Sequence, residues 1–174
     1  MIPFAEAGAC VQMQIVRRYG IRVVTANVGA SFVGDLDGAE IRIDPSATAE
    51  QRLFLLGHLF GHTVQWNTDE RAFALGQPQL PPVSEELLPA LLAYERQAAG
   101  YGVALFAGAG IGEVEPWYSN YSACDLSYLM HYYRTGEKAE FRSFWREDGP
   151  RVQPEPIPLF RPIRRVFRST GVVI

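Results

Sequence analysis

The sequence predicts a single α+β domain in which a small antiparallel sheet packs beside a helical bundle. Two observations carry this prediction. Residues 21–44 are rich in β-branched and aromatic side chains and are interrupted by Gly and Asp, a pattern typical of short strands joined by turns. The segments on both sides carry apolar residues at helical spacing. A chain of 174 residues is long enough for one domain with a packed core.

The composition is that of an ordinary soluble globular protein. Hydrophobic residues make up 48% of the chain, and the formal net charge of -3 predicts no general attraction to nucleic acid or membranes. No apolar run is long enough to span a bilayer, and Arg17 and Arg18 follow the first apolar stretch, the wrong order for a secretory signal. Cys10 and Cys124 lie far apart in the sequence, which favours reduced thiols in a cytoplasmic protein.

The first predicted elements are a helix and a hairpin. Apolar residues recur at helical spacing over residues 4–19, and Gly20 is placed to end that helix. The strands follow within residues 21–44. The letters "GDLDG" at residues 34–38 are a turn signal and predict an antiparallel hairpin.

A long buried helix is predicted next. Thr48 and Gln51 fit a capping box, and the apolar run that follows continues through Trp66. Residues 67–86 are rich in Pro, Gln and charge, which predicts a loop between helices.

Two further helices are predicted in the C-terminal half. Ser84 is placed to cap one that ends among the glycines of residues 100–112. Another is expected to begin near Ser122, with Asp125 at the capping-box position, and to end at Gly136 before a shorter helix.

The chain divides by composition into residues 1–150 and a Pro/Arg-rich tail, residues 151–174. One interpretation of the tail is a basic strip for nucleic acid or an acidic protein. The other is an extended segment that packs its apolar residues on the domain and leaves its arginines in water. We favour the second, so nucleic acid is expected as a partner only through this tail.

The stretch "LLGHLFGH" at residues 55–62 places His58 and His62 four residues apart. On a helix these positions share one face and lie about 6 Å apart along the axis, so both imidazoles can reach one ion. A catalytic zinc takes three protein ligands and keeps a fourth position open. Glu95 is the best third ligand, because a carboxylate on its apolar helix needs a metal or an arginine as partner.

These motifs, in this order, resemble the ImmA/IrrE-type zincin-like metallopeptidases. In that family the first motif reads H-E-x-G-H and the second resembles E-x-x-A-x-x-F-A. Here the first reads "HLFGH" and the second "ERQAAGYG", with Tyr101 and Gly102 where Phe and Ala are usual. The resemblance covers roughly residues 4–135. It implies a zincin-like core and a divalent metal, zinc, held by the two histidines and Glu95.

Leu59 stands where the family has its glutamate. That glutamate is the general base of H-E-x-x-H enzymes, and losing such a base costs about 10²–10⁴ in rate. Four acidic residues are candidate replacements, two in the loop after the histidine helix and two at the start of the later helix, where acidic residues usually serve capping and the helix dipole. They are Asp69, Glu70, Glu85 and Glu86.

The leading hypothesis is a degenerate member of this family. It would bind a divalent metal and act as a regulatory or protein-binding module for a protein or peptide partner, with little or no peptidase activity. The alternatives are an active metallopeptidase with a non-standard base, and a metal-free interaction domain with structural histidines. His131 could stabilise an oxyanion in an active relative, but its place near a helix end favours an interaction with the helix dipole.

Overall fold

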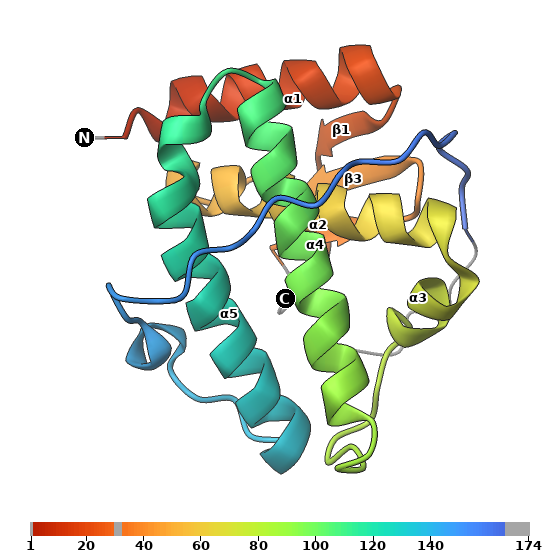
Figure 1. Cartoon of the computed structure of the whole chain (residues 1–174), viewed down its shortest axis with the longest axis vertical. Helices are drawn as coiled ribbons and strands as arrows, with labels where there is room; N and C mark the ends of the chain where they lie inside the picture. Colours follow the sequence, from red (N-terminus) through yellow and green to blue (C-terminus); the bar gives the residue numbers. More distant parts are fainter. Residues whose placement is uncertain (1, 30–32, 166–174) are drawn as a thin grey trace.

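The α+β class predicted from the sequence is confirmed. The computed structural model describes residues 2–29 and 33–165, and in it a helical assembly packs beside a small sheet (Figure 1). None of the helices in these ranges is long and apolar enough to cross a bilayer. The elements, in chain order, are α1 (Phe4–Tyr19), β1 (Arg22–Thr25), β2 (Gly34–Leu36), β3 (Glu40–Ile43), α2 (Ala49–Thr68), α3 (Glu70–Leu75), α4 (Leu88–Gly108), η1 (Gly112–Val114), α5 (Glu115–Thr135) and η2 (Phe141–Phe144).

The sheet is mixed, which corrects the expectation of an antiparallel sheet. Its strand order is β1-β3-β2. The predicted hairpin is present: β2 pairs antiparallel with β3 across a turn in which Gly38 has a φ of 88°, a conformation that favours glycine. On the other side of β3, β1 pairs parallel with it. An alternating apolar pattern indicates only that a segment is a strand. It does not indicate whether the strand pairs parallel or antiparallel with its neighbour in the sheet.

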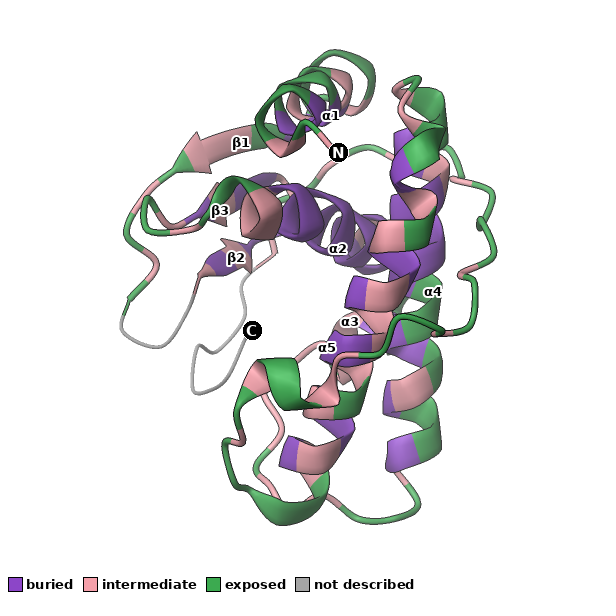
Figure 2. Ribbon diagram, turned by 90° about the vertical axis from the view of Figure 1, so that its left-hand side faces the viewer, coloured by how far each residue is buried: buried purple, intermediate pink, exposed green. Residues whose placement is uncertain are grey.

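α2 is the central element of the core. Both halves of the predicted capping box form, since Thr48 Oγ1 accepts from Gln51 N and Gln51 Oε1 accepts from Thr48 N. Every residue from 53 to 66 is buried (Figure 2). Polar side chains are rare in a helix that is buried on all sides. The polar side chains within residues 53–66 of α2 therefore need hydrogen-bond partners or a bound ion.

Two predictions about helices are wrong, and a third is partly right. α4 begins at Leu88 and not at Ser84, which agrees with the late start that Pro89 near the beginning of this helix indicates, since Pro89 lies in its first turn, where proline is tolerated. α5 begins at Glu115, with Pro116 in its first turn, so Asp125 lies in the middle of this helix and not at its start. The predicted loop 67–86 contains the short helix α3. The expected end of α5 at Gly136 is correct, and the element that follows it is the 3-10 helix η2.

Residues 151–165, here called the C-terminal strap, run extended over the helices (Figure 1). Val152, Ile157 and Phe160 pack against the main core, and the strap backbone contacts α4 where Glu155 N donates to Gly100 O at 3.1 Å. Packing of the tail on the domain, the favoured interpretation, is therefore confirmed for these residues. Residues 166–174 lie outside the described part of the chain.

Arginines of the strap pair with carboxylates of the domain. Their partners come from η1–α5, the β2–β3 turn and α3. The pairs are Arg151–Glu115 at 2.8 Å, Arg164–Asp37 at 3.0 Å and Arg165–Glu70 at 2.8 Å. These arginines are thus engaged within the molecule, which weakens the interpretation of the strap as a basic strip for a partner.

Two neighbouring residues test the strap. The ring of Phe160 stacks on Tyr19, with centroids 6.0 Å apart, whereas the side chain of Leu159 is fully exposed. Phe160→Ala should lower the free energy of unfolding by about 1–2 kcal/mol through lost burial and ring contact. Leu159→Ala should leave it unchanged. Urea denaturation measures both, and equal effects of the two variants would contradict the packing of the strap.

Candidate metal centre

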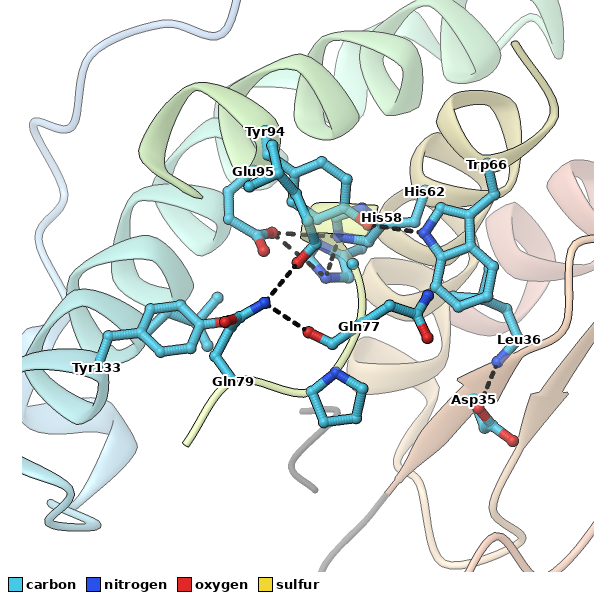
Figure 3. A pocket seen from close by; sticks show the side chains of 14 residues that line it. Asp35, Leu36, His58, His62, Trp66, Gln77, Gln79, Tyr94, Glu95 and Tyr133 are labelled. Carbon is cyan, nitrogen blue, oxygen red and sulfur yellow. Dashed lines mark hydrogen bonds and ion pairs between the residues drawn. The ribbon is translucent and has the colours of Figure 1, made fainter. Parts of the chain in front are cut away.

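His58, His62 and Glu95 meet inside the protein, where α2 crosses α4 (Figure 3). Each is at most 9% exposed. Their donor atoms form a small triangle. Nε2 of His62 lies 3.2 Å from Nε2 of His58 and 3.1 Å from Glu95 Oε2, and Nε2 of His58 lies 3.9 Å from that oxygen. The three residues singled out in the sequence are therefore brought together.

The close approach of α2 and α4 depends on Gly61. A Cβ atom at this position would overlap the backbone of Ala98, including its carbonyl oxygen. Glu95 lies one turn before Ala98 on α4, so the same contact brings its carboxylate next to His62. The glycine of the first motif and the alanine of the second thus touch each other, which gives their presence a physical reason.

Gln65 fixes the orientation of His62. Its side-chain nitrogen donates to the backbone carbonyl of Tyr94 at 2.8 Å, so its Oε1 is the atom that faces the imidazole. Nδ1 of His62 donates to this oxygen at 2.9 Å. Nδ1 therefore carries a proton, and Nε2 is the nitrogen that faces His58 and Glu95.

Aromatic contacts hold both imidazole rings. Tyr94 stacks on His62 with ring centroids 4.5 Å apart, and Phe54 stacks on His58 at 5.3 Å. The two imidazoles meet edge to face at 4.5 Å. Rings held in this way lose little further freedom when they bind an ion, which favours binding.

The electrostatics of the site suit a metal. Burial, reinforced by repulsion from His62, lowers the pKa of His58 to about 3, so its imidazole is neutral at physiological pH. Burial acts to raise the pKa of Glu95, but attraction to His62, their hydrogen bond and attraction to His58 outweigh it, and the pKa is lowered. Glu95 is therefore ionised. A neutral imidazole and a carboxylate are the forms in which these residues bind metals.

The donor spacing fits a tetrahedral ion. Ligand atoms about 2.0–2.1 Å from a tetrahedral zinc lie about 3.3 Å from one another, close to the 3.1–3.9 Å seen here. Without a cation, a proton lies between His62 Nε2 and Glu95 Oε2, as their hydrogen bond of 3.1 Å indicates. A metal ion would take the place of that proton. The donor set is thus one that can hold a divalent metal ion.

A small cavity adjoins the donors. Its volume is about 60 Å³. At about 10–15 Å³ for each water, this is room for a few water molecules and not for a length of peptide. The wall is formed by Asp35, Leu36, His58, His62, Trp66, Leu75, Gly76, Gln77, Pro78, Gln79, Tyr94, Glu95, Leu129 and Tyr133. His131 is not among these residues, and its imidazole instead contacts Thr135 and Phe144.

No described residue occupies the place of a general base. Leu59 is fully buried and packs beneath β2, where a Cβ added to Gly34 would lie 2.9 Å from its Cδ1. The only carboxylates in the described cavity wall are Glu95 and Asp35. Asp35 accepts from Arg42 Nη1 at 3.0 Å and lies on the far side of the cavity from the histidines (Figure 3).

The four acidic residues considered as replacement bases all lie away from the cavity wall. They are exposed and sit at or near the ends of α3 and α4. Asp69 accepts from Arg71 N and caps α3, and Glu70 pairs with Arg165. The sequence predicts Asp69 in a loop, and the structure shows instead that it caps the unpredicted helix α3.

Sequence reasoning missed Asp125. Its side chain is 3% exposed, and its Oδ2 lies 3.9 Å from Nδ1 of His58. Burial, followed by repulsion from Glu95, raises the pKa of Asp125 well above its usual value. The signal was present: Tyr118, Tyr121 and Leu129 lie on the same face of α5 at helical spacing, so position 125 faces inward.

No protein-family model matches the chain, and no curated protein or solved structure is significantly similar to it. The resemblance to the ImmA/IrrE-type family therefore stays a prediction, which rests on two motifs and their order. The donor geometry described above does not depend on that resemblance.

Gly61→Ala tests the crossing of the two helices. The new methyl group must push α4 away, which should cost about 1–3 kcal/mol of stability and weaken metal binding. Gly8→Ala is the matched control, because this helical glycine is buried but its added Cβ would lie 4.0 Å from the nearest side-chain atom, Cδ1 of Leu56. It should be neutral or stabilising by up to about 1 kcal/mol. Urea denaturation and bound metal are measured for both, and an unimpaired Gly61→Ala variant would contradict the argument.

Proposed function

We propose that this protein is a degenerate zincin-like domain of the ImmA/IrrE type. It binds one divalent metal ion, zinc, through His58, His62 and Glu95, and serves as a regulatory or protein-binding module with little or no peptidase activity. The convergence of three buried donors, with Nε2 of His62 facing the other two, is the observation that carries this proposal.

The choice of zinc follows from the donor types. Two imidazoles and one carboxylate form a common zinc ligand set, whereas Mg²⁺ and Ca²⁺ prefer sites made of oxygen atoms. When bound, such an ion supplies a Lewis acid with one coordination position open. The chain's own contribution is to hold α2 and α4 together at that point and to keep the donors out of bulk water.

Two features argue against ordinary peptidase chemistry. Peptide hydrolysis at such a centre needs a base that takes the proton of the attacking water, and the position of that base holds the buried Leu59. The cavity of about 60 Å³ is also smaller than sites that enclose a substrate, which are typically about 300–1,000 Å³. Both features support binding in preference to turnover.

The small cavity also limits what a partner can place there. A few atoms fit, such as the end of a side chain or a chain terminus. Carboxylate, imidazole and thiolate are the protein groups that zinc accepts as ligands. A protein or peptide partner that presents one of these groups at the tip of a protruding segment is the kind that suits the site.

Zinc retention tests the ligand assignment. Purified wild-type protein should hold zinc near one per chain, and His62→Ala should lose it and unfold at a lower temperature in zinc, because bound metal stabilises the native state. His131→Ala removes a histidine outside the cavity and should retain the metal. Elemental analysis and thermal unfolding give the readouts. Absence of zinc from the wild type would favour the metal-free alternative. Retention of zinc by His62→Ala would contradict the assignment of His62 as a ligand.

Hydrolysis assays test the loss of peptidase chemistry. Wild-type protein loaded with zinc should show no chelator-sensitive cleavage of unstructured peptides, measured as fluorescence release from a labelled substrate. Leu59→Glu restores the family motif but places a carboxylate at a fully buried position, so it should also lower stability. Leu59→Met, which preserves volume, should cost less than about 1.5 kcal/mol. Robust wild-type cleavage that a chelator abolishes and zinc restores would establish the active alternative.

A further inference from the structure

The two histidines differ in the side chain that faces Nδ1, the ring nitrogen that points away from the donor triangle. Nδ1 of His62 donates to the neutral amide of Gln65, which comes from the same helix. Nδ1 of His58 faces a carboxylate from another helix, Oδ2 of Asp125 on α5, at 3.9 Å. Among the described residues this nitrogen has no other polar partner.

Asp125 has no evident structural reason to be where it is. It lies in the middle of α5, on the face that packs into the interior, and its Oδ1 has no hydrogen-bond partner in the described part of the chain. A buried carboxyl group without partners destabilises a fold, and an apolar residue of similar size would cost less. Packing does not explain a carboxyl group at this position, but an interaction with the neighbouring His58 does.

We propose that Asp125 is a positioning residue for the metal centre: it accepts the Nδ1 proton of His58 and so holds the imidazole with Nε2 free to bind the ion. This inference rests on the proposed function. The present separation is about 1 Å longer than a hydrogen bond, so a small adjustment of either side chain completes the contact. A carboxylate behind a ligating histidine fixes its tautomer and makes it a stronger donor.

The arrangement extends the metal centre to a third helix. α2 supplies the histidines, α4 supplies Glu95, and α5 supplies Asp125. If a divalent ion were bound, its charge would favour ionisation of Asp125, and the carboxylates of Asp125 and Glu95 would together balance that charge. Removing Asp125 should therefore affect the metal more than the fold.

Asp125→Asn separates a positioning role from a structural one. It keeps the shape of the side chain and removes the charge. Zinc affinity, measured by competition with a chromogenic chelator, should fall about 10–100-fold. The metal-free variant should be as stable to urea as the metal-free wild type, because Oδ1 of Asp125 has no hydrogen-bond partner among the described residues for the substitution to remove. Asp35→Asn, in the cavity wall but on its far side, is the control and should bind zinc as the wild type does.

A second measurement uses the wild type alone and does not depend on the folding of a variant. Nitrogen NMR of the zinc-loaded protein should show His58 protonated on Nδ1 and coordinated through Nε2. Coordination through Nδ1 would overturn the proposal. So would equal zinc affinity in Asp125→Asn, or a weaker affinity matched by an equal loss of stability in the metal-free protein. Failure of the wild type to bind zinc would be a different result, because it removes the proposed function itself.

Discussion

The packing of α2 against α4 at Gly61 and Ala98 is the contact on which the site depends. It allows the two backbones to approach so closely that no side chain fits between them. Gly57 and Gly102 extend the same pattern, since each makes room for the ring of Tyr118 on α5. Glycine within a helix costs about 0.5–1 kcal/mol relative to alanine, so its use here indicates that close packing offsets an intrinsic penalty. The donor triangle is a consequence of this approach.

Burial sets the chemistry of the donors once the helices have placed them. The same loss of water that lowers the pKa of His58 would make an isolated Glu95 carboxylate costly, and attraction to the histidines reverses that effect for Glu95. Glu95 is thus held as a carboxylate beside two imidazole nitrogens, where it would attract a cation. Metal binding and the stability of the α2–α4 contact are therefore expected to be linked, each favouring the other.

The sequence predicted the features that local rules control. Thr48 and Gln51 form their capping box, Gly20 and Gly136 end their helices, and the spacing of His58 and His62 places both on one face of α2. Features set by contacts between distant segments were not predictable in this way. The parallel pairing of β1 with β3 depends on where the chain crosses the sheet, which no residue pattern encodes.

Asp125 shows how a local rule can mislead. Ser122 followed by Asp125 reads as a capping box, but Pro116 begins the helix earlier and turns the same carboxylate toward the interior. The choice between the two interpretations depends on where the helix starts, and the apolar residues on the inward face of α5 show that it starts before Ser122.

At Leu59 the local environment decides which residue type is stable. A fully buried leucine contributes about 1.5–3 kcal/mol, and a glutamate there would have to be desolvated next to β2. An active enzyme accepts that cost in order to hold its base. In this chain Leu59 packs beneath β2, while His58 and His62 on either side of it face Glu95. Core packing and donor placement are thus assigned to different positions of one helix.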